Sequence, residues 1–266
     1  MANIPKKVAE RFIKEVGRFQ ALLRKAKDRD INEADTGTIV TDILGRVFGY
    51  DKYSEVTREY AIRGRYCDLA IEIEGEIKYL IEVKAIGLDL KENHLRQATT
   101  YGAEKGVQWV ALTNGIVWHV YKVRFERPIG VELVCSFNFL ELNPRKREDQ
   151  DRLFVLCKKG VRRAAIEEFH QHVQTVNKFV LGALVLSDPV LSVIRRELRR
   201  IPPGVKVDSD EIETILVNDV LKREVVEGEA AKDAAARVKK ASAKLLRERK
   251  STRKSERRKT PRVVQE

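Results

Sequence analysis

Hydrophobic side chains recur at helical spacing through the first fifty residues. One run begins after Pro5, and a second begins near Glu33 and ends at Gly49. Apolar residues three and four positions apart form one face of a helix. Proline suits the first helical position and glycine the residue that follows the last. The pattern therefore predicts two amphipathic helices.

From Lys52 to about Asn138 the apolar residues alternate with polar ones. Alternation with a period of two is typical of half-buried β-strands. One segment, residues 90–106, has helical spacing instead. The predicted strands are 55–62, 65–73, 77–85, 108–114, 116–125 and 131–137. This order of elements predicts an α/β fold class, an α+β arrangement around a mixed sheet.

Helical spacing returns from Asn143 onward. Beyond residue 228, large apolar side chains are nearly absent except Leu245 and Leu246, so we expect a nascent helix that fades into disorder. The sequence thus predicts a first domain over 1–142, a helical extension over 143–227 and a basic, largely disordered tail over 228–266. The helices expected in the extension cover about 147–158, 161–186, 188–200 and 208–224.

The charge is concentrated in the tail. The chain carries 52 Lys and Arg against 40 Asp and Glu, a net charge of +12. Residues 232–266 hold 14 of the basic and four of the acidic residues, which leaves +2 for the rest. Such a tail binds phosphates through counterion release, without sequence preference; a tail that serves solubility is the alternative. The predicted nucleic-acid contacts are Lys250, Arg253, Lys254, Arg257, Arg258 and Lys259.

Several classes of protein are disfavoured by the sequence. The longest apolar run, 179–186, is far shorter than the roughly 20 residues of a membrane span. The N-terminus has no apolar stretch typical of a signal peptide. The three cysteines show no Cys-x-x-Cys spacing, so we expect reduced thiols. These features predict a cytoplasmic protein without a membrane partner.

The segment from 67 to 85 contains the candidate chemistry. Gly75 is the natural centre of a hairpin turn, and a register in which paired numbers sum to 150 places Asp68 opposite Glu82. Lys84 lies on the same face as Glu82, because side chains alternate along a strand. Two carboxylates about 5 Å apart repel each other and favour a cation. Mg²⁺ accepts one or two carboxylates and completes its shell with water and phosphate oxygens, so the pattern predicts phosphodiester hydrolysis. Mn²⁺ is the expected substitute.

A bland interpretation of the same segment stays open. Glu-x-Lys on a strand is common as a solvated salt bridge. A slip of one residue in the hairpin would turn Asp68 to the other face.

The wider order of residues resembles a nuclease family. An acidic helix residue is followed by Asp-x(13)-Glu-x-Lys across a hairpin and by Gln-x(3)-Tyr on the next helix. This set resembles the PD-(D/E)xK nuclease superfamily, in particular the N-terminal nuclease domain of type I restriction-enzyme R subunits, over about 20–125. The resemblance implies a restriction-endonuclease-like core and a Mg²⁺-dependent endonuclease. It implies metal ligation by Asp68, Glu82 and the Val83 carbonyl, catalysis by Lys84, an accessory acid at Glu33, and Gln97 and Tyr101 as residues that orient the site or touch the nucleic-acid backbone.

Two departures from the family limit the expectation. Cys67 stands where the family's name-giving proline would be. The chain also has no Gly-x(4)-Gly-Lys-Ser/Thr motif, so it lacks the helicase motor of R subunits. We expect DNA as the partner, with RNA left open. The alternatives are a catalytically silent nucleic-acid-binding adaptor, and a subunit whose apolar stripe at 179–186 forms a homodimer or docks a helicase or methyltransferase.

Overall fold

The computed structural model describes residues 3–62, 65–126, 128–201 and 206–259. It divides into two compact units, residues 1–173 and 174–266, and each is described by itself. Within the described residues, no helix is long and apolar enough to cross a membrane.

Unit 1 is an α+β structure built on a mixed sheet, as predicted. In the described part of the chain the sheet has six strands in the order β1-β2-β3-β4-β5-β6. The β3–β4 pair is parallel and the other neighbouring pairs are antiparallel. All six predicted strands are present within a few residues. Their bounds are β1 Val56–Ile62, β2 Arg65–Ile73, β3 Glu76–Val83, β4 Trp109–Thr113, β5 Val117–Arg124 and β6 Gly130–Asn138.

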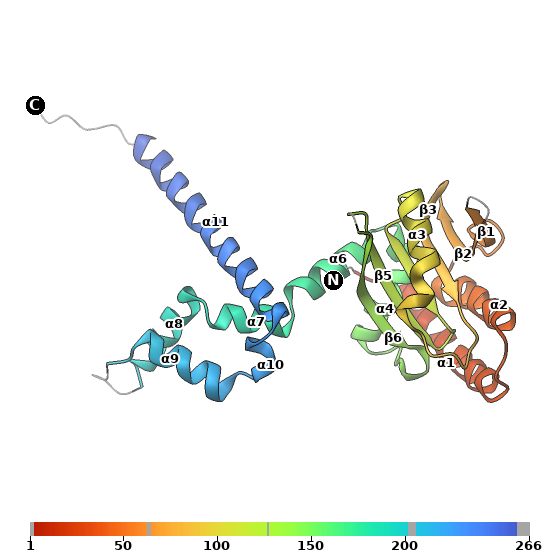
Figure 1. Ribbon diagram of the computed structural model, residues 1–266, viewed down its shortest axis with the longest axis horizontal. Coiled ribbons are helices and arrows are strands. Elements are labelled where there is room, and N and C mark those ends of the chain that lie inside the picture. The colour runs from red at the N-terminus through yellow and green to blue at the C-terminus, as the bar shows by residue number, and fades with distance from the viewer. Residues whose placement is uncertain (1–2, 63–64, 127, 202–205, 260–266) are drawn as a thin grey trace, which may run out of the picture. The chain divides into compact units, whose positions relative to one another are not determined.

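Helices cover both faces of this sheet (Figure 1). The buried faces of α1, α2 and α4 share one hydrophobic core with one side of the sheet, and α3 packs on the other side. Trp118 is fully buried in the first core and stacks on Phe137. The helical elements of unit 1 are α1 Lys6–Asp28, α2 Glu33–Ile43, the π-helical turn η1 Leu44–Phe48, η2 Glu92–Leu95, α3 Arg96–Lys105, η3 Phe139–Glu141, α4 Arg147–Leu156, α5 Lys158–Val161 and α6 Ala165–Thr175.

The first unit extends beyond the predicted boundary at 142. Residues of α4 and α6, such as Phe154 and Ile166, are buried in the same core as α1 and the sheet. Their apolar faces therefore complete the first core, and the boundary lies at 173. Helical spacing alone does not tell which core a helix packs against.

Unit 2 is helical. Val180 of α7 packs against Ala234 and Val238 of α11, so part of the apolar stripe at 179–186 is used inside the unit. The predicted helix over 161–186 is broken, because Ala164 has a positive φ of 53° and the Asn177 side chain caps a new helix. The elements are α7 Lys178–Val185, α8 Asp188–Leu198, α9 Ser209–Ile215, η4 Leu216–Val220, α10 Arg223–Val226 and α11 Glu229–Lys259.

The basic tail begins with the nascent helix that the sequence predicts. The helix α11 continues to Lys259. Alanine, lysine, arginine and glutamate, which dominate this segment, are strong helix formers and need no apolar core to favour a helix. The side chains of the six predicted phosphate contacts lie outside the described residues, so their role stays a prediction.

Candidate active site

The hairpin between β2 and β3 has the predicted centre but a different turn. Glu74 and Gly75 both have positive φ, 57° and 80°, as in a two-residue type I′ turn. The pairs next to the turn therefore sum to 149. A bulge that leaves Lys78 unpaired restores the sum of 150, at which Leu69 lies opposite Ile81. The predicted register is thus correct at the end of the hairpin where the acids lie.

Both β1 and β2 lose their side-chain alternation at one shared position. Tyr60 and its partner Cys67 pack with the α3 core, whereas Leu69, two residues along β2, belongs to the core on the α2 side. Strict alternation would keep residues 67 and 69 on the same face. The residues at the break are Glu59 and Asp68: Glu59 has a positive φ of 48°, and the pair is missing from an otherwise continuous ladder.

The carboxylate of Asp68 takes over a backbone hydrogen bond at this break. The Val83 N–H donates to Asp68 Oδ2 at 2.7 Å, beyond the last ladder pair between β2 and β3. The bond fixes Asp68 against the end of β3. On its other side β3 stays paired with β4, where the Lys84 N–H donates to the Thr113 carbonyl oxygen.

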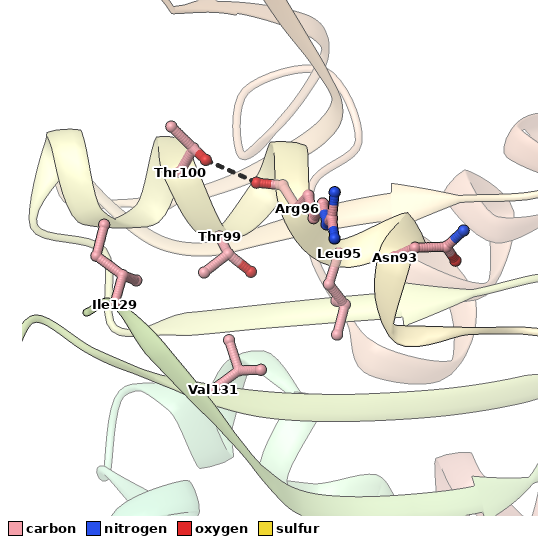
Figure 2. A pocket seen from close by; sticks show the side chains of 7 residues that line it. All are labelled: Asn93, Leu95, Arg96, Thr99, Thr100, Ile129 and Val131. Atoms are coloured by element: carbon pink, nitrogen blue, oxygen red, sulfur yellow. Dashed lines mark hydrogen bonds between the residues drawn. The ribbon is translucent and has the colours of Figure 1, made fainter. Parts of the chain in front are cut away.

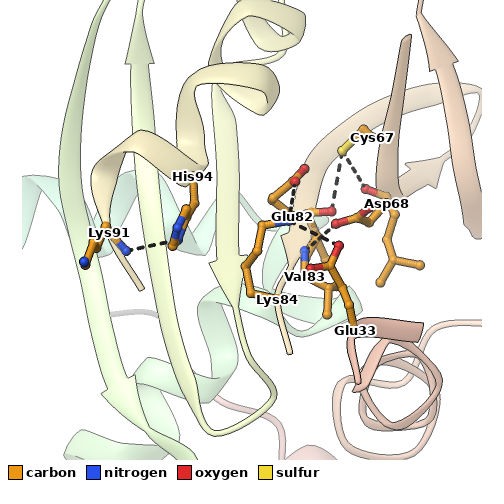
Figure 3. Close-up of polar contacts among 10 residues, drawn as sticks. Glu33, Cys67, Asp68, Glu82, Val83, Lys84, Lys91 and His94 are labelled. Atoms are coloured by element: carbon orange, nitrogen blue, oxygen red, sulfur yellow. Dashed lines mark hydrogen bonds and ion pairs between the residues drawn. The ribbon is translucent and has the colours of Figure 1, made fainter. Parts of the chain in front are cut away.

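Lys84 connects two of the predicted acids (Figure 3). Its Nζ lies 2.8 Å from Glu82 Oε1 and 3.3 Å from Glu33 Oε1. Glu33 is the first residue of α2, which begins there because the Asn32 side chain accepts a hydrogen bond from Asp35 N–H. The structure therefore brings together Glu33 of α2, Asp68 from within β2, and Glu82 and Lys84 from the C-terminal end of β3.

Two of these groups, Glu33 and Asp68, line a cavity of about 300 Å³, whereas Glu82 and Lys84 are not among its described lining residues. Its walls come from α2, β1, β2 and β3, so it opens beside the break in the two strands. The lining residues are Glu33, Ala34, Gly37, Arg58, Glu59, Asp68, Leu69 and Val83.

Two carboxylates of the site, those of Glu82 and Asp68, hold their protons more tightly than free acids. Burial, and then the charge of Asp68, raises the pKa of Glu82 to about 7, although Lys84 acts in the opposite direction. Burial also raises the pKa of Asp68, against the Val83 N–H hydrogen bond. Burial works against the charge on Lys84, but its bond to Glu82 and the nearby acids outweigh it and raise the pKa of Lys84. The site thus carries more negative charge than its own cations neutralise.

The acids have the chemistry of a Mg²⁺ site. Glu82 is 6% exposed, and its Oε2 is buried and accepts no hydrogen bond from any described residue. A buried carboxylate oxygen without a partner is costly unless a cation or donor satisfies it. Carboxylate oxygens are the ligands that Mg²⁺ prefers. Asp68 and Glu82 would hold the ion, and the Val83 carbonyl stays a predicted third ligand.

The described residues contain no group of three or more His, Cys, Asp and Glu side chains placed around one metal ion. A Mg²⁺ site with two carboxylates and several waters is smaller than such a group. Cys67 is not a ligand candidate, because burial, followed by Glu82 and Asp68, raises the pKa of its thiol to about 12.

The predicted helix residues take different positions. Tyr101 is 1% exposed in the core under α3, so contact with a nucleic-acid backbone is not open to it; an orienting role stays a prediction. The side chain of Gln97 lies outside the described residues. His94 accepts a hydrogen bond from the Lys91 N–H at Nδ1, 3.2 Å away (Figure 3), and so serves to cap η2.

Two residues of the cavity, Arg58 and Glu59, were not predicted from the sequence. The available signal was the interrupted alternation at 57–62, where three polar residues are followed by three apolar ones. It could not be interpreted without the pairing of β1 with β2, because only that pairing places Glu59 beside Asp68.

A larger cavity, of about 420 Å³, lies between α3 and β6 (Figure 2). None of the seven described residues that line it is acidic, so it offers no carboxylate for a hard cation. Its Thr100 hydroxyl donates to the Arg96 carbonyl oxygen within the helix. Of these two cavities, the smaller one is therefore the one that acidic side chains line.

No protein-family model, curated protein or solved structure matches the chain.

Proposed function

We propose that this protein is a Mg²⁺-dependent endonuclease that hydrolyses phosphodiester bonds of DNA. The observation that carries the proposal is the meeting of Asp68, Glu82 and Lys84 at the end of one hairpin, with an unpartnered buried oxygen on Glu82. The restriction-endonuclease-like core belongs to the same proposal. It is supported by the mixed sheet, in which a three-stranded meander precedes a crossover helix and a parallel strand.

Each residue of the site has a distinct task in this proposal. A bound Mg²⁺ would polarise the phosphate and lower the pKa of a water nucleophile. Asp68 and Glu82 supply its oxygen ligands. Lys84, whose side chain is 15% exposed, remains charged at neutral pH and stabilises the negative charge that develops on the phosphate. Glu33, half exposed at the mouth of the cavity, holds Lys84 toward the site.

Cleavage of supercoiled plasmid and of single-stranded DNA with Mg²⁺ or Mn²⁺ tests the proposal. Lys84→Ala should abolish cleavage and leave DNA binding largely intact. Lys78→Ala is the matched control, because Lys78 lies on the same strand but pairs with Glu76 beside the turn. If the wild-type protein nicks neither substrate and Lys84→Ala changes nothing, the proposal is refuted.

One observation favours a second candidate, the catalytically silent nucleic-acid-binding adaptor. Lys84 already neutralises one oxygen of Glu82 at 2.8 Å, so a metal-free site is partly balanced in charge. The adaptor predicts DNA binding that is unchanged by EDTA and by Asp68→Asn. Calorimetric titration with Mg²⁺ separates the two, since the adaptor takes up no metal.

A further inference from the structure

Arg58 is the one cation among the described residues that line the site cavity. The same lining carries three carboxylates, those of Glu33, Glu59 and Asp68. None of them lies within ion-pair distance of Arg58: among the described residues the arginine makes no salt bridge and no hydrogen bond. Its five N–H donors are therefore available to a molecule that enters the cavity.

The sheet fixes where Arg58 stands. It lies directly opposite Leu69 in the β1–β2 ladder, and opposite residues in an antiparallel pair project to the same side. Leu69 is buried against the α2 side of the sheet. On that side α2 has Gly37, where an added Cβ would come 3.7 Å from Arg58 Nη2. The guanidinium thus lies close to the helix backbone, at the wall of the cavity.

The break in β1 separates Arg58 from the residues that follow it. Glu59 takes a left-handed conformation that non-glycine residues rarely adopt, and Tyr60 then packs on the opposite face of the sheet. Without this break, Arg58 and Tyr60 would share a face. Because Glu59 adopts this conformation, Arg58 can line the acidic cavity while Tyr60 packs in the α3 core.

Charge balance indicates what the arginine is for. The cavity lining (Glu33, Arg58, Glu59 and Asp68) and the adjoining Lys84–Glu82 pair together hold four carboxylates against two cations. One divalent cation would neutralise the set. A phosphodiester then adds one negative charge, which would meet a net negative site if Arg58 were absent. A planar guanidinium also matches the geometry of two phosphate oxygens.

From this geometry we infer that Arg58 binds a phosphate group of the substrate inside the cavity, and that it determines the affinity for the phosphodiester. The inference rests on the proposed function for the identity of the substrate. It assigns a substrate-binding residue that lies outside the Asp-x(13)-Glu-x-Lys pattern.

The test compares Arg58→Gln and Arg58→Lys in the full chain. Arg24→Gln, an exposed arginine of α1, is the matched control with the same loss of charge in the same unit. Binding of thymidine 3′,5′-bisphosphate is measured in the presence of Ca²⁺ and again in EDTA, and plasmid cleavage is measured with Mg²⁺. Circular dichroism checks that each variant is folded, which we expect because Arg58 is an exposed residue of the edge strand β1.

Loss of a charge-assisted, bidentate contact should weaken bisphosphate binding about tenfold or more in Arg58→Gln. Arg58→Lys should recover part of the loss, because it keeps the charge but not the fork. KM for cleavage should rise in parallel. If Arg58→Gln binds and cleaves as the Arg24→Gln control does, the inference is refuted and the proposed function is untouched.

The opposite failure is recognisable as well. If neither the wild-type protein nor any variant cleaves DNA, the proposed function is refuted, and the bisphosphate measurement alone decides about Arg58. A loss of binding specific to Arg58→Gln would then support a phosphate site in a protein that is not a nuclease. If Arg58→Gln binds thymidine 3′,5′-bisphosphate as tightly as the Arg24→Gln control does, the inference is overturned.

Discussion

Glu82→Gln should remove the part of the pH dependence of the stability of unit 1 that Glu82 causes in the absence of divalent cations. Burial and the nearby Asp68 raise the pKa of Glu82 to about 7 from an ordinary 4.5. The folded state therefore binds this proton more tightly than the unfolded state does. The contribution of Glu82 to stability is therefore greatest below about pH 4.5, and it falls as the pH rises to about 7.

The size of the effect follows from the two pKa values. Each tenfold difference in proton affinity is worth about 1.4 kcal/mol, so the charged form of Glu82 lowers the free energy of unfolding by about 3 kcal/mol above pH 7. Glutamine has the same shape and carries no charge at any pH. Relative to the wild-type protein, Glu82→Gln should gain about 3 kcal/mol between pH 4.5 and pH 8.

Tryptophan fluorescence is the suitable assay. The two tryptophans of the chain, Trp109 and Trp118, both lie in unit 1, so urea titrations in EDTA at several pH values report that unit without the helical one. Glu10→Gln, on the exposed face of α1, is the control and should keep a constant difference from wild type. If the difference in the free energy of unfolding between Glu82→Gln and wild type stays constant over the same pH range, the raised pKa of Glu82 is refuted.

Further predictions concern the metal, the backbone and the tail. Mg²⁺ should raise the melting temperature of the wild-type protein and have little effect on Asp68→Asn, because a ligand stabilises only a state that binds it; scanning calorimetry at rising Mg²⁺ checks this, and equal shifts would contradict it. Glu59→Gly should raise the free energy of unfolding by about 1 kcal/mol, since glycine adopts a positive φ without strain; urea denaturation that shows a loss instead would count against strain at Glu59. Gly160→Ala should lower the free energy of unfolding by about 3 kcal/mol, because an added Cβ would overlap the Phe154 carbonyl oxygen. A melting temperature equal to that of wild type would exclude this clash. Replacing the six predicted phosphate contacts of the tail by glutamine should reduce the slope of log K against log salt for duplex DNA by about 5, whereas an unchanged slope would assign the tail to solubility.

The local pattern of apolar and polar residues was sufficient to predict the strands and part of the candidate site. The period-two segments gave six strands because each strand is half buried, and the glycine at 75 located the hairpin. The register at the acids was predicted from an unbroken pairing, whereas the molecule reaches it through a shorter turn and a bulge at Lys78. Two departures compensate for each other, and neither is visible in the alternation of residues.

Features that depend on neighbours distant in sequence could not be predicted. The break at Glu59 and Asp68 requires two paired strands and a third whose N–H the Asp68 carboxylate satisfies. The boundary at 173 depends on α4 and α6 being buried against α1 and the sheet. Helical periodicity reports that a face is apolar but not which surface will cover it.

Every described side chain that borders the acidic cavity comes from the stretch between residues 33 and 83, and Lys84 follows at once. All of these residues have therefore left the ribosome by the time that β4, the parallel neighbour of β3, emerges from it. We therefore expect the acidic cavity to form during synthesis, before the helical unit has been made. Segments added or exchanged after residue 173 would then leave the acidic cavity itself unchanged.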